Sequence, residues 1–280
     1  DVWPASHHKV MPELMPVPKA SRKVLVIGGG CGGMQAAITA SDRGHQVILC
    51  EKEKVLGGLI NFTDHTDHKI DIRNYKNLLI REVEKRPIEV RKGCEVTADT
   101  IREIQPEAVI LAVGSDDLIL PIEGIENAMT AVDVYANDFA GLGKSTIVLG
   151  GGLVGCEAAA DYIDHGIKTT IVEMQECLMP ETTGLYRTAV HDFIDKNGGK
   201  YEVNAKVVKV GKDFVIAEQK GKEITIKADS VVNAMGRRAH STKALKDAIT
   251  VPVWEIGDCT RARQIGDAVR EAWTAAMEII

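Results

Sequence analysis

Two short apolar runs, each ending abruptly in glycine, stand out in the pattern of hydrophobic and polar positions. Residues 24–27 lead into the glycine-rich stretch 28–33, and residues 147–149 lead into the stretch 150–155. Continuous apolar runs of this length that end at a turn signal are typical of buried strands in a parallel sheet. We therefore expect a buried strand over each run and a tight turn after it.

Each glycine-rich stretch is followed by an alanine-rich segment and then by another apolar run. Residues 34–41 and 156–164 have the composition of helices, and Gly44 and Gly166 follow them as stop signals. The further apolar runs, each of which predicts one more strand, cover residues 47–49 and 170–172. The sequence thus predicts strand, helix and strand at two places.

The two places are copies of each other at a constant offset of 122 positions. Six identities share this offset near the start of each copy: Gly28 and Gly150, Gly30 and Gly152, Gly33 and Gly155, Ala37 and Ala159, Gly44 and Gly166, Glu51 and Glu173. Three more share it near the end: Val109 and Val231, Ala112 and Ala234, Gly114 and Gly236. The sequence therefore predicts an α/β protein that contains one fold unit twice.

The glycine spacing is that of a dinucleotide site. In the G-x-G-x-x-G motif one glycine makes the tight turn, one lets the backbone approach a pyrophosphate, and one lets the helix pack on the strand. The N–H groups at the helix start receive the phosphates. The residues placed in this way are Gly28, Gly30 and Gly33 in the first copy and Gly150, Gly152 and Gly155 in the second. Two such motifs in strand–turn–helix context predict two Rossmann-like domains.

An acidic residue closes the second strand of each copy. Glu51 and Glu173 stand where a carboxylate accepts hydrogen bonds from the hydroxyls of an adenosine ribose, and both would repel a 2′-phosphate. The residues that follow Glu173 are Met174, Gln175 and Glu176, so no arginine is at hand to bind that phosphate. We expect the second site to prefer NADH over NADPH.

On these motifs the sequence resembles the pyridine-nucleotide-dependent flavoprotein oxidoreductases, in which an NAD domain interrupts an FAD domain. The resemblance implies a linker at residues 1–20, an FAD-binding domain at 21–115 plus 243–280, and an NAD(H)-binding domain inserted at 116–242. It implies further cofactor contacts at Gly58, Gly114 and Asp258 for FAD, and at Glu157 and Gly236 for NADH. Asp258 follows Gly257, and the aspartate at that position binds the flavin side chain in the family.

A closer resemblance is to the C-terminal region of the NADH:flavin oxidoreductase, enoate reductase and 2,4-dienoyl-CoA reductase group, relatives of old yellow enzyme. It covers about residues 21–280 and rests on the segments 44–51, 56–58, 152–157 and 256–259. In that group electrons pass from NADH to FAD, then through a four-iron cluster to FMN in an upstream barrel, and on to an activated alkene. The resemblance implies NADH and an upstream barrel domain or subunit as partners, and FMN and the cluster only in that upstream part.

Residues 267–280 form the last patterned segment. Six apolar residues fall on one helical stripe: Ala268, Val269, Ala272, Trp273, Ala276 and Met277. This predicts an amphipathic helix that starts at Gly266–Asp267 and packs on the FAD domain. If its N-terminus faces the flavin ring, as the resemblance implies, its dipole would stabilise the reduced flavin.

The composition of the chain excludes several classes of protein. The chain has 280 residues, 45% of them hydrophobic and 26% charged, with a net charge of −6. No apolar run approaches the roughly 18 residues of a membrane span, and no basic stripe suits nucleic acid. We expect a soluble, cytoplasmic protein of about two domains that binds neither membrane nor nucleic acid. Six dispersed cysteines without a C-x-x-C pair predict free thiols rather than disulfides or a redox dithiol.

Other eye-catching residues favour structural interpretations. The stretch 64–68 (Asp-His-Thr-Asp-His) lacks the helical spacing of metal ligands and is predicted to be a solvated loop. Cys31 and Cys156 lie in the glycine turns, where any small residue packs well. No catalytic residue is predicted, because in hydride transfer the flavin carries the chemistry and the protein positions it.

Three functions stay open from the sequence. The first is an FAD-dependent NADH oxidoreductase module. The second is a structural or regulatory module that binds ADP or FAD without turnover. The third is an electron-input subunit resembling the small subunit of glutamate synthase. Reduction of bound flavin by NADH separates the first from the second, and capture of an iron–sulfur partner would favour the third.

Overall fold

The computed structural model describes residues 16–182 and 184–280, and the chain divides into two compact units. Unit 1 takes in the described residues up to Asp64, together with Lys69–Asp116 and Arg238–Ile280. Unit 2 consists of His65–His68 and Asp117–Arg237. The predicted linker at residues 1–20 falls for the most part outside the described residues.

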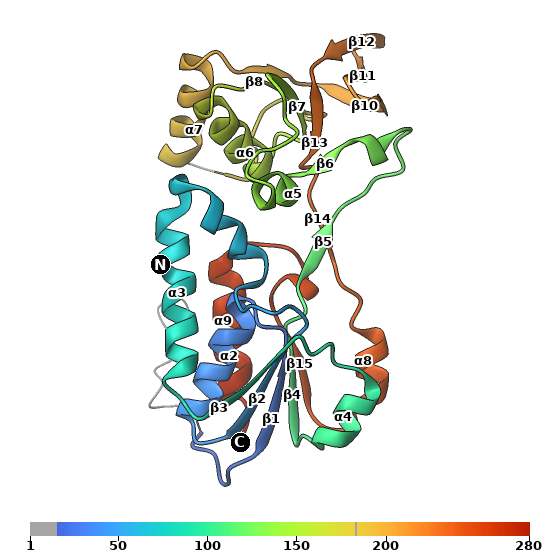
Figure 1. Cartoon of the computed structure of the whole chain (residues 1–280). Coiled ribbons are helices and arrows are strands. Elements are labelled where there is room, and N and C mark those ends of the chain that lie inside the picture. Colours follow the sequence, from blue (N-terminus) through green and yellow to red (C-terminus); the bar gives the residue numbers. More distant parts are fainter. Residues whose placement is uncertain (1–15, 183) are drawn as a thin grey trace. The chain divides into compact units, whose positions relative to one another are not determined.

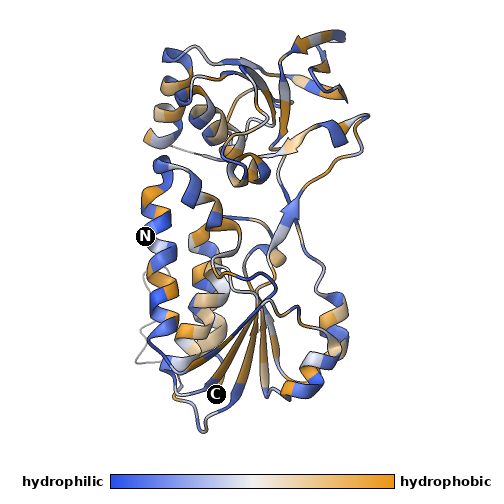
Figure 2. Ribbon diagram, in the orientation of Figure 1, coloured by the Kyte–Doolittle hydropathy of each residue, from blue (hydrophilic) through white to orange (hydrophobic). Residues whose placement is uncertain are grey.

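Unit 1 is built on a five-stranded parallel sheet with the order β15-β4-β1-β2-β3. Its strands are β1 (Lys23–Ile27), β2 (Gln46–Glu51), β3 (Ile88–Lys92), β4 (Ala108–Leu111) and β15 (Val253–Glu255). The two central strands, β1 and β4, are buried on both faces, as their unbroken apolar sequences predict. Figure 2 shows them as the most hydrophobic part of the unit.

Helices cover both faces of this sheet (Figure 1). On one face lie α2 (Cys31–Asp42), α3 (Ile70–Glu84) and α9 (Ile265–Met277), and on the other lie α4 (Ala98–Ile104) and α8 (Lys243–Ala248). Helices α2 and α9 pack closely through small residues, among them Ala36, Ala40, Ala272 and Ala276. The predicted C-terminal helix is thus present, but it begins at Ile265, one residue before the expected start at Gly266–Asp267, and ends at Met277 rather than at Ile280.

Unit 2 repeats the plan with the parallel sheet β6-β13-β7-β8-β9. Its strands are β6 (Met129–Thr130), β7 (Ser145–Leu149), β8 (Lys168–Val172), β9 (Lys200–Glu202) and β13 (Ser230–Asn233). Its helices are α5 (Ala131–Ala136), α6 (Leu153–Asp164) and α7 (Leu185–Lys196). The predicted α/β fold with two Rossmann-like halves, the second inserted into the first, is confirmed.

Unit 2 also carries an antiparallel meander that was not predicted from the sequence. It consists of β10 (Ala205–Val210), β11 (Phe214–Gln219) and β12 (Lys222–Lys227). The chain leaves unit 1 through β5 (Ser115–Asp117) and returns through β14 (Arg237–Ala239), and these two strands pair with each other. In the described part of the chain, no helix is both long and apolar enough to cross a bilayer.

Candidate dinucleotide-binding sites

Each glycine turn lies at the carboxyl end of the strand at which the strand order of its sheet reverses, β1 in unit 1 and β7 in unit 2. In unit 1 the strand β1 has β2 on one side and β4 on the other, and in unit 2 the strand β7 has β8 and β13 beside it. The crevice at such a switch point is where open α/β sheets bind ligands. The sequence-predicted residues of each copy therefore converge within their own unit.

Only glycine is tolerated at the first position of each turn, because of its backbone conformation and because a carbonyl group lies close by. Gly28 and Gly150 have φ values of +107° and +100°, which side chains rarely allow. A Cβ on Gly28 would approach the carbonyl oxygen of Ala112 closer than 3.0 Å, and one on Gly150 would meet that of Ala234 at 2.6 Å. The two turns thus make the same contact, with residues that are again 122 positions apart.

The two predicted ribose-binding glutamates hold their own glycine turns. Glu51 accepts hydrogen bonds from the backbone N–H of Gly29 (2.6 Å) and of Glu53 (2.8 Å), one on each carboxylate oxygen. Glu173 does the same with Gly151 (2.6 Å) and Gln175 (2.7 Å). Each carboxylate oxygen has two lone pairs, so each keeps one for a ribose hydroxyl. Both side chains are about 95% buried, which makes them rigid acceptors.

The space beside the second glycine tests whether a dinucleotide fits. Among the described residues, no atom would lie within 4 Å of a Cβ on Gly30, whereas a Cβ on Gly152 would be 3.1 Å from Glu181 Oε1, the end of a flexible side chain. Gly30 and Gly152 are the N-caps of α2 and α6, and no side chain caps either helix in the described structure. Free N–H groups and a positive helix end suit a pyrophosphate in both units, and in unit 1 the flank of the second glycine is open as well. The residues present fit FAD and NAD(H).

In unit 1 three more predicted residues come to this crevice. Gly58 lies against Gly30, since a Cβ on Gly58 would be 3.0 Å from the Gly30 Cα. Gly114 follows β4, and a Cβ there would meet nothing within 4 Å. Asp258 accepts hydrogen bonds from Ser115 Oγ (3.1 Å) and from the Arg263 backbone N–H (3.2 Å), one on each oxygen. These two hydrogen bonds orient the Asp258 carboxylate, which is half-exposed.

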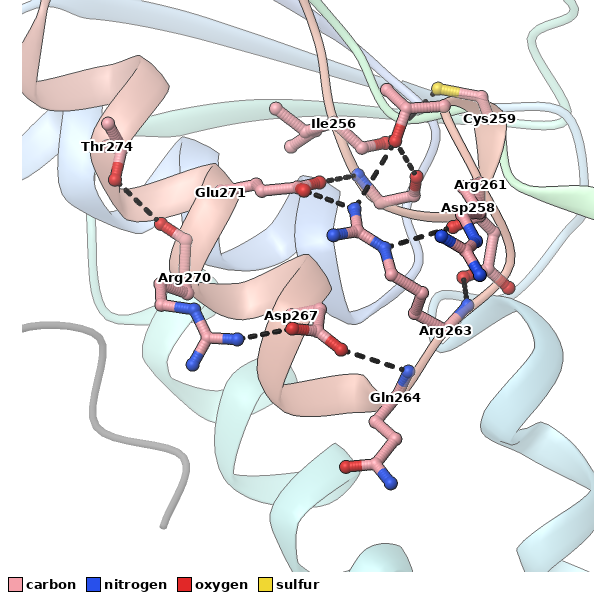
Figure 3. A network of polar contacts seen from close by, with 12 residues as sticks. Ile256, Asp258, Cys259, Arg261, Arg263, Gln264, Asp267, Arg270, Glu271 and Thr274 are labelled. Carbon is pink, nitrogen blue, oxygen red and sulfur yellow. Dashed lines mark hydrogen bonds and ion pairs between the residues drawn. The ribbon is translucent and has the colours of Figure 1, made fainter. Parts of the chain in front are cut away.

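A polar network from α9 supports Asp258, and it was not predicted from the sequence (Figure 3). Glu271 accepts a hydrogen bond from the Gly257 backbone N–H (2.7 Å) and forms an ion pair with the Arg263 guanidinium. The α9 N-terminus also carries Asp267, which accepts from the Gln264 backbone N–H and pairs with Arg270. This carboxylate offsets part of the helix dipole that was expected to act on the flavin.

In unit 2 the remaining predicted residues are Glu157 and Gly236. Glu157 lies on α6 and accepts a hydrogen bond from the Tyr186 hydroxyl of α7. Gly236 follows β13, has a φ of +118°, and a Cβ on it would meet nothing within 4 Å. The tyrosine partner could not be read from the sequence, because it comes from the next helix.

The segment predicted as a solvated loop is helical. Residues Gly58–His65 and Asp67–Lys69 form short 3-10 helices, so the loop prediction for residues 64–68 was wrong about conformation. Asp64 is held by the buried Nζ of Lys76, which ties this segment to α3. Among the described residues, no group of three or more His, Cys, Asp or Glu side chains is arranged to hold a metal ion.

The thiols in the two glycine turns are expected to be unreactive. Burial raises the pKa of Cys31 to about 11, and burial together with the Glu173 charge raises that of Cys156 to about 12. At pH 8 both are then almost wholly protonated, and only the thiolate is nucleophilic. Mass spectrometry after brief iodoacetamide treatment at pH 8 should show Cys31 and Cys156 unmodified, with labelling increasing as the pH is raised. Rapid labelling of either at pH 8 would contradict this.

The family model described as pyridine nucleotide-disulphide oxidoreductase matches residues 22–260, most of the chain and both glycine turns. The chain belongs to this family. The family binds FAD and NAD(H), in agreement with the two sites described above. All six cysteines are free thiols, and none of them lies three positions from another as in a C-x-x-C pair.

Two curated relatives cover nearly the whole chain. The NADH oxidase of Thermoanaerobacter brockii is 36% identical over 98% of this chain and 43% of its own length. The cinnamate reductase of Clostridium sporogenes is 32% identical over 92% of this chain and 39% of its own length. The identity to these relatives confirms the resemblance to the enoate reductase-like group. The chain spans less than half of their length.

Solved structures give the same result. A 2-naphthoyl-CoA reductase in complex with 2-naphthoyl-CoA superposes with a TM-score of 0.88 and 25% identity, over 95% of this chain and 41% of that one. The thioredoxin reductase of T. acidophilum superposes with a TM-score of 0.73 and 21% identity, over 92% of this chain and 97% of that one. At 21% identity, the similarity to the thioredoxin reductase shows a shared fold alone.

Proposed function

We propose that the chain is an FAD-dependent NADH oxidoreductase module in which unit 1 holds FAD and unit 2 holds NADH. The observation that carries the proposal is the duplicated site, in which Glu51 and Glu173 each bridge a glycine turn and keep acceptor capacity for a ribose. Two NADH molecules have no redox chemistry to perform on each other. Bound FAD supplies the acceptor for the hydride of NADH.

The chain's own residues bind and orient the two cofactors. The N–H groups at the starts of α2 and α6 bind the pyrophosphates, and Glu51 and Glu173 fix the adenosine riboses. Asp258, oriented by Ser115 and the Arg263 backbone, binds the hydroxyls of the flavin side chain. An upstream FMN- and iron–sulfur-bearing barrel domain or subunit would then accept the electrons and reduce an activated alkene.

The assignment of FAD to the unit 1 turn rests on Asp258. Its carboxylate accepts a hydrogen bond from Ser115, next to Gly114, and its charge acts on Cys31 at the start of α2, whereas position 258 has no counterpart in the repeat, because it lies beyond the second copy. A polyhydroxylated flavin chain gives such a carboxylate donors to accept from. The names of the relatives, NADH oxidase and cinnamate reductase, support an NADH-dependent oxidoreductase module.

An anaerobic spectrum tests the proposal. The purified chain is reconstituted with FAD, freed of unbound cofactor, and mixed with NADH without oxygen. Bleaching of the flavin absorbance is the expected result. A protein that stays colourless after reconstitution overturns the proposal. Flavin that is retained but not reduced indicates a structural module, and specific capture of an iron–sulfur protein would indicate an electron-input subunit.

Cofactor preference is tested by Glu173→Ala combined with Met174→Arg. Loss of the ribose contact should weaken NADH binding by on the order of 1–3 kcal/mol, while the arginine attracts the 2′-phosphate of NADPH. Met174 is 66% exposed, so an arginine fits there. The measurement is the ratio of dissociation constants for NADH and NADPH. Unchanged NADH binding would show that the nicotinamide cofactor is not held by Glu173.

The control is Met174→Arg alone. It leaves the Glu173 carboxylate on the N–H groups of Gly151 and Gln175, so the turn keeps its support. NADH binding should then be close to that of the unaltered protein, with a smaller gain for NADPH. Thermal unfolding of both variants separates a lost ribose contact from a loosened glycine turn.

A further inference from the structure

The two repeats share backbone contacts beyond the residues that the sequence singled out, but the segment after the second strand differs between them, among other positions at Leu59 and Glu181. The Gly57 backbone N–H donates to the Gly29 carbonyl at 2.9 Å, and the Met179 N–H donates to the Gly151 carbonyl at 2.7 Å. Both pairs keep the 122-position offset. Two residues further on, the offset places Leu59 opposite Glu181. An apolar side chain in unit 1 is thus replaced by a carboxylate in unit 2.

This difference changes what lies beside the second glycine of each turn. A Cβ on Gly152 would be 3.1 Å from Glu181 Oε1, whereas a Cβ on Gly30 would have no atom of residues 16–182 or 184–280 within 4 Å. The second glycine is where the backbone must be approached by a pyrophosphate. The Glu181 carboxylate therefore lies in the phosphate-binding space of unit 2, and the same space in unit 1 is open.

Negatively charged side chains also act on the N-terminal turn of α6. Cys156 lies in the first turns of α6, and after burial the charges that raise its pKa are those of Glu173, Glu181 and Glu157. Of the charges that act on this thiol, Arg187 works in the opposite direction. The N–H groups that would receive a pyrophosphate in unit 2 thus stand in an acidic surrounding.

We propose that Glu181 is a specificity-determining residue that keeps the dinucleotide of unit 2 exchangeable, while Leu59 lets unit 1 retain its own. This rests on the proposed function, in which FAD stays bound and NADH and NAD⁺ exchange at every turnover. The carboxylate repels the pyrophosphate and competes with it for the N–H groups of the α6 N-terminus. Glu181 is exposed, so its side chain can turn to solvent and binding is weakened rather than blocked.

The test compares Glu181→Gln with the unaltered protein and with Glu176→Gln as a matched control. Glu176 is also exposed, but it is not among the charges that act on Cys156. Glu181→Gln should bind ADP-ribose and NADH about tenfold more tightly, as expected for removing one charge beside a pyrophosphate. Glu176→Gln should leave both constants nearly unchanged. The gain should shrink in high salt, because an exposed charge is screened.

The reciprocal change is Leu59→Glu, with Leu59→Gln as its uncharged control of equal size. Leu59→Glu should release FAD on gel filtration, and Leu59→Gln should retain it. In steady-state assays Glu181→Gln should lower the KM for NADH without raising kcat, since product release also slows. A role of Glu181 in folding alone would not produce this split.

The outcomes separate the two levels of the proposal. If the unaltered protein binds NADH and Glu181→Gln binds it equally or more weakly, the inference about Glu181 is overturned and the proposed function stands. If neither protein binds NADH or ADP-ribose, both are overturned. Tighter binding by Glu181→Gln together with loss of FAD from Leu59→Glu supports both.

Discussion

Gly30→Val is expected to yield a folded protein that does not retain FAD. Gly30 has φ −72° and ψ −176°, an extended conformation that valine adopts readily, and a Cβ there meets no atom within 4 Å in the part of the chain that the structure describes. The added side chain therefore fills only the space meant for a ligand. Affinity for FAD should fall by about a hundredfold, or about 3 kcal/mol, because the pyrophosphate can no longer approach the backbone.

The measurement is the ratio of flavin to protein absorbance after gel filtration, with circular dichroism to confirm the fold. Gly152→Val is the matched variant in the second repeat. It should keep FAD but lose reduction of the flavin by NADH, since the one close atom among the described residues, Glu181 Oε1, ends a flexible side chain that can turn away. Loss of flavin from Gly152→Val and its retention by Gly30→Val would reverse the assignment of the cofactors.

The glycine turns and the acidic residues could be predicted well from the sequence, because those contacts are local to one strand–turn–helix unit and occur twice. Identity at a constant offset is enough to mark Gly28, Glu51 and their partners. The structure adds that Gly29 and Gly151 donate to these acids, which explains why the acid stands at a fixed spacing after the turn. The cofactor roles themselves stay predictions.

Residues that act from a distant element could not be predicted. Ser115 and Glu271 meet the Asp258 turn only because β4, β15 and α9 converge in the folded unit. Lys76 lies in a helix whose sequence is largely polar, and nothing in its spacing reveals that its ammonium is buried against Asp64. Such contacts depend on tertiary packing, which periodicity in one segment does not record.

The antiparallel meander in unit 2 was missed for a different reason. Strand β12 alternates apolar and polar residues over Lys222–Lys227, and β10 and β11 carry partly similar patterns. Alternation of this kind predicts half-buried strands. The internal repeat does not reveal them, since this segment has no glycine landmark in register with the first copy.

Gly33→Ala is expected to destabilise unit 1 strongly, although it adds a single methyl group. A Cβ on Gly33 would approach the carbonyl oxygen of Gly28 far closer than 3.0 Å, and the Cβ of Ala112 stands at 3.4 Å on another side. The carbonyl belongs to the packed turn between β1 and α2, so no side-chain rotation relieves the clash. The helix must move off the strand, at a cost of about 3 kcal/mol or more.

Gly44→Ala is the matched control, because Gly44 ends the same helix with φ +86° and open space around it. Alanine there meets only the left-handed backbone penalty of about 1–2 kcal/mol. Thermal unfolding followed by far-ultraviolet circular dichroism should therefore show a larger loss for Gly33→Ala than for Gly44→Ala. Gly155→Ala should repeat the large loss in unit 2, since its Cβ would meet the Gly150 carbonyl oxygen in the same way. Equal losses for Gly33→Ala and Gly44→Ala would mean that helix and strand are not packed through the third glycine, and the dinucleotide-site geometry of both turns would have to be abandoned.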